Sequence, residues 1–178
     1  MEKLHISNGK KLEEIIDTYG WPGEAEGVEI TNAAWLIAMH AISLPSLQRK
    51  VLALLKNNPE KNLSSEVAML EDRILVFSGK KQLYGTQMDW DELGKISPYP
   101  IANPEHVDER RKMVGLEPLS NAIENLRQRA TRENEQPPNN LAERTNKREE
   151  WMLKVGWISS KDEIDSAYNK YRESNLSA

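Results

Sequence analysis

Two side chains of this sequence have the chemistry of an acid–base pair, and both occur in apolar segments with helical spacing. His40 falls between Leu36 and Ile37 on a helical wheel, on what we expect to be an inward face. Histidine is the side chain most often used in general acid–base catalysis. Asp72 lies among apolar residues of a later helix, where its carboxylate could orient the imidazole or hold an arginine. We therefore interpret His40 and Asp72 as candidate catalytic residues of a transfer or hydrolysis reaction.

Further polar side chains occupy positions where core residues are expected, and they would bind the substrate of such a reaction. Guanidinium groups offer paired donors that fit phosphate or carboxylate. The segment around Gly85 presents amide, hydroxyl and phenol groups where a ligand can approach the backbone. The candidate ligand-binding residues are Gln48, Arg73, Gln82, Tyr84, Thr86, Gln87, Arg110 and Arg111. Together they predict an anionic ligand, phosphorylated or nucleotide-like, in a pocket between helices.

A structural role for the same residues is the alternative that the sequence leaves open. An unpaired buried charge destabilises a fold by several kcal/mol, so buried charges are expected to meet partners. Asp72 would then pair with Arg73 or Arg110 and fix the packing of the helices. In that case the chain is a non-catalytic interaction module. The tail aromatics that would bind its protein partner, or pack on the core, are Trp151, Trp157, Tyr168 and Tyr171.

Several segments together resemble one bacterial family that is known only as a domain of unknown function. The segments are His40 in its apolar helix, LPSLQRKVLALL at 44–55, LEDR at 70–73, KQLYGTQ at 81–87 and DERRKMVGLEPL at 108–119. The resemblance covers about residues 12–119 and implies that the polar residues belong to a family pattern. It implies no activity, so the choice between a site and a scaffold stays open.

No residue pattern typical of a metal or cofactor site is present. The chain has no cysteine and three histidines, which excludes thiolate metal sites, iron–sulfur clusters and disulfides. His106 and Glu109 are one helical turn apart, but no HExxH pattern accompanies them. The glycine patterns of phosphate-binding loops, dinucleotide folds and hydrolase elbows are missing as well. We therefore expect neither a metal nor a cofactor.

Helical periodicity and end signals predict the elements that would position the candidate residues. Helices are expected over residues 10–19, 33–42, 45–57 and 66–77, from 104 to 115, and from 118 onward. Alternating residues at 82–88 predict a short strand that pairs with 94–101 as a hairpin. We predict a mainly α, compact helical domain with a small β-hairpin and a helical C-terminal extension.

Composition divides the chain near residue 120. The net charge of −4 lies in residues 1–120, while residues 121–178 have equal numbers of acidic and basic residues and few large apolar ones. We predict a helical core domain with a polar pocket over 1–120, and a charged helix, a linker at Pro137-Pro138 and a helical appendage over 121–178. The mild acidity does not favour nucleic-acid binding. Neither a membrane span nor an apolar leader is visible, so we expect a cytoplasmic protein.

Overall fold

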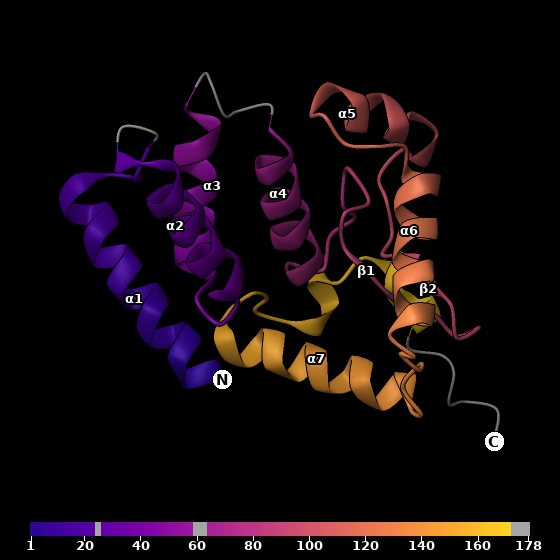
Figure 1. The fold of residues 1–178 in the computed structure, drawn as a ribbon. Helices are drawn as coiled ribbons and strands as arrows, with labels where there is room; N and C mark the ends of the chain where they lie inside the picture. The colour runs from indigo at the N-terminus through magenta and orange to yellow at the C-terminus, as the bar shows by residue number, and fades with distance from the viewer. Residues whose placement is uncertain (24–25, 59–63, 172–178) are drawn as a thin grey trace. The chain divides into compact units, whose positions relative to one another are not determined.

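The computed structural model describes residues 1–23, 26–58 and 64–171, and their backbone is mainly α-helical (Figure 1). Seven α-helices and one two-stranded antiparallel sheet occur in these ranges. The predicted fold class, mainly α with a small β-hairpin, is confirmed. The chain forms two compact units, Met1–Asn62 (unit 1) and Leu63–Ala178 (unit 2).

Unit 1 consists of the helices α1 (Glu2–Tyr19), α2 (Val28–His40) and α3 (Pro45–Lys56). In this unit α1 packs against α2, and α2 packs against α3. Helix α1 begins well before the predicted start, because the helix continues through Gly9. A Cβ atom at Gly9 would lie 2.7 Å from Leu44 Cδ1, so the glycine allows a close contact that offsets its poor helix propensity.

Helix α2 also begins earlier than predicted. Thr31, which precedes the predicted start, lies inside the helix, and its hydroxyl donates to the carbonyl oxygens of Gly23 (2.7 Å) and Gly27 (3.2 Å). This bonding to a preceding carbonyl lets a threonine sit within a helix rather than at its cap.

Unit 2 begins with α4 (Ser65–Phe77), which the sequence predicted closely. Ser64 caps this helix, because its Oγ accepts a hydrogen bond from the backbone N–H of Val67 at 3.3 Å. The strands β1 (Met88–Trp90) and β2 (Ile96–Pro98) then form an antiparallel hairpin in which Trp90 lies opposite Ile96.

The strand predicted over residues 82–88 is wrong for most of its length. Residues 83–87 form a loop, and Gln82 makes an isolated parallel bridge to Ile101. Side-chain alternation suits a strand there, but the backbone N–H groups of the loop bind a side chain of α4 instead of a neighbouring strand.

Two proline-initiated segments follow the hairpin, as the sequence predicted. The first comprises the 3₁₀ helix η2 (Pro104–His106) and α5 (Val107–Met113). The second is α6 (Leu119–Arg132), which begins directly after Pro118. Helix α6 packs against both β2 and α5 (Figure 1).

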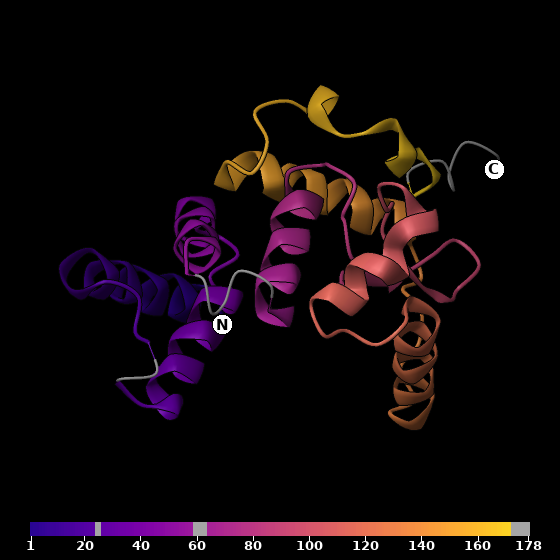
Figure 2. The same cartoon turned by 90° about the horizontal axis from the view of Figure 1, so that it is seen from above.

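The C-terminal part of unit 2 packs on the end of α4. It comprises α7 (Leu141–Val155) and the 3₁₀ helices η3 (Lys161–Glu163) and η4 (Ser166–Tyr171). Phe77 contacts the rings of Trp151 and Trp157, with centroids 5.3 and 5.4 Å apart, and both views show α7 beside the end of α4 (Figures 1 and 2). The Tyr168 hydroxyl donates to the carbonyl oxygen of Lys80 at 2.9 Å.

Three of the four tail aromatics thus pack within unit 2, where Trp157 and Tyr168 are buried. The side chain of Tyr171 lies outside the described part. The division predicted at residue 120 stays a prediction, and residues on both sides of it belong to unit 2.

The turn of the hairpin depends on Asp91. Its carboxylate accepts hydrogen bonds from the backbone N–H groups of Leu93 and Lys95, both at 2.9 Å, and from Ser97 Oγ at 2.7 Å. Partial burial alone would raise the pKa of Asp91, but these hydrogen bonds outweigh burial and hold the pKa below its usual value. A lowered folded-state pKa stabilises the fold above the ordinary pKa of aspartate, and this stabilisation is lost as the pH falls through the folded-state pKa.

We expect Asp91→Asn to reduce the free energy of unfolding at pH 7 by about 1–2 kcal/mol, the usual contribution of hydrogen bonds to a carboxylate. The difference from the wild type should shrink below about pH 4, where aspartate is protonated in the unfolded chain. Urea unfolding between pH 7 and pH 3 measures this, with Glu92→Gln as the control at a neighbouring exposed carboxylate. A difference that is independent of pH would contradict the role of the ionised carboxylate.

Candidate functional site

The carboxylate of Asp72, on α4, holds the loop formed by residues 82–87 (the 82–87 loop). It accepts hydrogen bonds from the backbone N–H groups of Leu83 (2.7 Å), Tyr84 (3.1 Å) and Thr86 (2.9 Å), and from the Thr86 hydroxyl (2.9 Å). Asp72 is fully buried. Burial raises its pKa, and these hydrogen bonds oppose the rise. Because all the donors belong to one loop, the carboxylate fixes the conformation of that loop.

Gln82 closes the two ends of the same loop. Its side-chain Nε2 donates to the carbonyl oxygens of Gln87 and Tyr99, both at 2.9 Å, and its Oε1 accepts from the backbone N–H of Gln87 at 2.9 Å. The side chain of Gln82 is fully buried and all of these polar atoms are satisfied. Gln82 therefore joins the two ends of the loop to Tyr99, the residue that directly follows β2.

Gly85 occupies the turn of the loop, with φ at 70°. A Cβ atom there would lie 2.8 Å from Leu119 Cδ1 and 2.9 Å from Ile101 Cδ1. Glycine is thus required by the left-handed backbone and by the packing of two apolar side chains. We expected Gly85 to leave room for a ligand at the backbone, but these side chains occupy the space beside its Cα.

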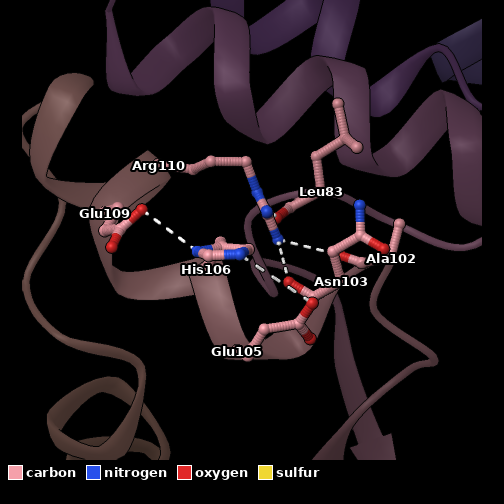
Figure 3. Close-up of polar contacts among 7 residues, drawn as sticks. All are labelled: Leu83, Ala102, Asn103, Glu105, His106, Glu109 and Arg110. Carbon is pink, nitrogen blue, oxygen red and sulfur yellow. Dashed lines mark hydrogen bonds and ion pairs between the residues drawn. The ribbon is translucent and has the colours of Figure 1, made fainter.

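Arg110 binds the opposite side of the loop. Its Nε donates to the carbonyl oxygen of Leu83 at 2.8 Å, and its Nη2 donates to those of Ala102 (2.7 Å) and Asn103 (3.1 Å), as Figure 3 shows. The peptide group that joins Leu83 to Tyr84 therefore has its carbonyl oxygen bound by a guanidinium and its N–H bound to the Asp72 carboxylate.

Arg111 binds the next carbonyl group of the loop, that of Tyr84. Its Nη1 donates to the carbonyl oxygen of Tyr84 and its Nε to that of Glu117, both at 2.6 Å. Arg111 is 3% exposed, and burial lowers its pKa. The sequence predicted a direct pair between Asp72 and an arginine. In the structure, Arg110 and Arg111 interact with Asp72 through the loop backbone, which the opposite charges polarise.

A cavity lies beside this loop within unit 2, and we call it the α6 cavity. Its volume is about 570 Å³. It is lined by Met69, Gly85, Thr86, Met88, Arg111, Leu116, Glu117, Ala122, Asn125, Leu126, Arg129 and Arg132. The 82–87 loop, α5 with the segment that follows it, and α6 each contribute to its walls.

Positive charge predominates in the α6 cavity. Arg129 and Arg132 come from the last turns of α6, and Arg111 is held by the loop contacts. The one lining carboxylate, Glu117, accepts hydrogen bonds from Asn125 Nδ2 at 3.1 and 3.2 Å. Arg129 has a long ion pair with Glu133, 3.9 Å apart in a half-exposed position, which costs little to break.

Two of the predicted ligand-binding residues of unit 2 line this cavity, and others hold or adjoin the 82–87 loop. Thr86 and Arg111 line the cavity. Arg73 Nε donates to Gln87 Oε1 (3.3 Å), and Gln87 Nε2 donates to Thr86 Oγ1 (3.2 Å), so a chain of contacts ends at the wall. Burial lowers the pKa of Arg73 and is the main cause of a raised pKa at Tyr84. Gln82 and Arg110 are bonded to the loop from outside the cavity lining.

His40 and Gln48, the remaining predicted site residues, belong to unit 1. The inward position predicted for His40 is wrong: it is exposed, and its ring stacks on His5 with centroids 5.0 Å apart. Helix α2 buries Ala34 and Ala38 instead. The predicted burial of Gln48 is confirmed, and its Nε2 donates to the carbonyl oxygen of Ala38 at 2.8 Å.

Sequence reasoning missed the contribution of α6 to the cavity. The run of charges around Arg127–Arg132 by itself favours a solvated helix face or a packing arm, since arginines in a polar stretch are usually exposed. A signal was present, because the residues that α6 contributes recur with helical spacing and thus share one face. They are Ala122, Asn125, Leu126, Arg129 and Arg132.

The exposed histidine near Arg110 contacts two glutamate side chains. His106 Nδ1 lies 3.2 Å from Glu109 Oε2, and its Nε2 lies 4.0 Å from Glu105 Oε1 (Figure 3). Within the described ranges, no group of three or more histidine, aspartate or glutamate side chains is placed to hold a metal ion. In the same part of the chain, no helix is long and apolar enough to cross a membrane.

Comparison with known proteins places most of the chain in one family. The model of a family described as a family of unknown function (DUF6624) matches residues 1–131. No curated protein and no solved structure matches the chain. The match spans unit 1 and unit 2 as far as α6, so it includes every residue of the α6 cavity except Arg132.

We expect Asp72→Asn to reduce the free energy of unfolding by about 2–4 kcal/mol, as when a buried charge network loses one member. The asparagine keeps one acceptor oxygen, but its NH₂ group would face the N–H groups of the loop. Urea unfolding followed by circular dichroism measures the loss. Glu150→Gln on α7 removes an exposed carboxylate and should change stability by less than about 0.5 kcal/mol. Equal stability of the two variants would show that the loop does not depend on Asp72.

Proposed function

We propose that this chain, which belongs to the family of unknown function DUF6624, binds a small anionic molecule with an apolar part in the α6 cavity. The observation that carries the proposal is the lining of that cavity. Three guanidinium groups and one carboxylate share it with apolar side chains. The apolar members are Met69, Met88, Leu116, Ala122 and Leu126.

The arrangement favours a phosphate or carboxylate group. Guanidinium donors bind such groups in pairs, and hydrogen bonds between two charged groups are about twice as strong as neutral ones. The apolar side chains reduce access of water, which strengthens the attraction between an anion and the arginines. A cavity of about 570 Å³ is within the range of small-molecule sites.

The 82–87 loop has a supporting part in this function. Asp72, Gln82 and the two adjacent arginines of α5 hold the loop, and the loop places Thr86 and Gly85 in the cavity wall. A wall that is rigid before binding reduces the entropy that binding costs. The residues that the sequence marked as a ligand-binding set thus support the site largely from behind its surface.

The proposal is a binding function without a catalytic step. Asp72 was a candidate catalytic residue, but its oxygens accept hydrogen bonds from four donors of its own loop. A carboxylate held in this way is suited to positioning rather than to proton transfer with a ligand. The alternative, a tail that binds a protein partner, has less support, since Trp157 and Tyr168 are buried within unit 2.

We expect the full chain to bind phenyl phosphate, which combines an anion with an apolar ring, more tightly than inorganic phosphate. Arg129→Gln and Arg132→Gln should each weaken the binding of phenyl phosphate about tenfold, which corresponds to about 1.4 kcal/mol. Isothermal titration calorimetry at low salt measures both. Lys154→Gln, which removes one positive charge from α7 outside the cavity, should leave the affinity unchanged. An equal loss of affinity in all three variants would indicate unspecific charge attraction and contradict the proposed site.

A further inference from the structure

A second cavity adjoins the α6 cavity within unit 2, and we call it the Trp90 cavity. Its volume is about 420 Å³. It is lined by Met88, Asp89, Trp90, Ile96, Leu126, Arg129, Glu135, Gln136, Pro138 and Arg144. Three of these residues, Met88, Leu126 and Arg129, line the α6 cavity as well. The shared side chains make the two cavities direct neighbours.

Trp90 is the side chain of this cavity that is best suited to hold a ring. It is half-buried on β1, on the same face as Met88, because side chains alternate along a strand. Among the described residues, the indole makes no hydrogen bond and no ring contact. A flat, partly exposed indole provides a stacking surface for planar ring systems, as aromatic residues do in proteins that bind nucleic-acid bases.

Two of the charged side chains that line the Trp90 cavity, Asp89 and Arg144, are paired with each other, and Glu135 is a further carboxylate in the lining. Asp89, on the opposite face of β1, accepts hydrogen bonds from Arg144 Nη1 and from the Tyr99 hydroxyl, both at 2.7 Å. This pairing neutralises the carboxylate, so that it does not repel an anionic ligand. Arg129 remains at the junction of the two cavities, where it can reach a phosphate group.

Part of the wall of the Trp90 cavity comes from outside the family match. Glu135, Gln136, Pro138 and Arg144 follow residue 131, where the match ends. The α6 cavity, by contrast, has all but one of its lining residues within the match. The segment after α6 thus adds a second compartment to a cavity that the family region forms.

We propose that the Trp90 cavity is a subsite for the planar heteroaromatic ring of a ligand whose phosphate lies in the α6 cavity. The ligand class is then that of a nucleoside monophosphate, with the base stacked on Trp90 and the phosphate bound by Arg129 and Arg132. This inference rests on the proposed function, because the α6 cavity has to bind the anionic group.

The test compares AMP with ribose 5-phosphate, which lacks the base, by calorimetry on the full chain. AMP should bind at least tenfold more tightly. Trp90→Leu should remove this difference and leave the affinity for ribose 5-phosphate unchanged, whereas Trp90→Phe, which keeps a ring, should retain most of it. Trp21→Leu in unit 1 is the matched control and should change neither affinity.

Each outcome separates the subsite from the proposed function. If ribose 5-phosphate and AMP bind equally, and Arg132→Gln weakens both, the subsite is wrong and the anion site stands. If neither compound binds but phenyl phosphate does, the subsite is wrong and the proposed function stands; if none of the three binds, both proposals are wrong. If Trp90→Leu does not fold, Trp90→Phe is used instead, with tryptophan fluorescence as the readout. AMP should quench the fluorescence of the wild type more than that of Trp90→Phe, because the variant lacks the indole on which the base stacks. Equal quenching of the two proteins would overturn the stacking on Trp90.

Discussion

The structure of unit 2 depends on one buried carboxylate. Asp72 has no access to solvent, and its charge is stabilised by backbone N–H groups from a loop that begins ten residues after it. Removing a carboxylate from water is costly unless such donors replace the lost hydration. The 82–87 loop must therefore keep the conformation that directs its N–H groups to α4. This requirement outweighs the tendency of the segment to form a strand, and it moves the hairpin to β1 and β2.

The same requirement determines what the loop presents on its other side. Once its N–H groups are directed to Asp72, the carbonyl oxygens of Leu83 and Tyr84 point away, and Arg110 and Arg111 bind them. The peptide group between Leu83 and Tyr84 lies between these opposite charges and is polarised by both, which strengthens its two hydrogen bonds. Arg111 reaches the wall of the α6 cavity as a consequence. The network thus has a structural role, and the proposed site for an anion lies at its edge rather than within it.

The segment that follows α6 has two roles in unit 2: it buries apolar side chains, and it lines a cavity. Trp157 and Tyr168 bury apolar surface against α4 and the hairpin, which explains how a chain segment with few large apolar residues remains folded. Its preceding part, around Gln136, lines the second cavity. This segment lies beyond residue 131, so the family model does not cover the wall that the segment adds to the second cavity.

Local signals were sufficient for much of the fold. The cap at Ser64, the proline before α6 and the periodicity of α3 and α4 depend on residues only a few positions apart, and the sequence therefore predicted these elements and the burial of Asp72. It could not predict which face of α2 is buried, because a helix that is apolar nearly all round carries no information about its orientation. The inward position predicted for His40 was wrong for this reason. Nor could it identify the partners of Asp72 or bring Arg129 into a cavity wall. Those contacts join segments that are distant in the chain, and only the packed structure determines which of them meet.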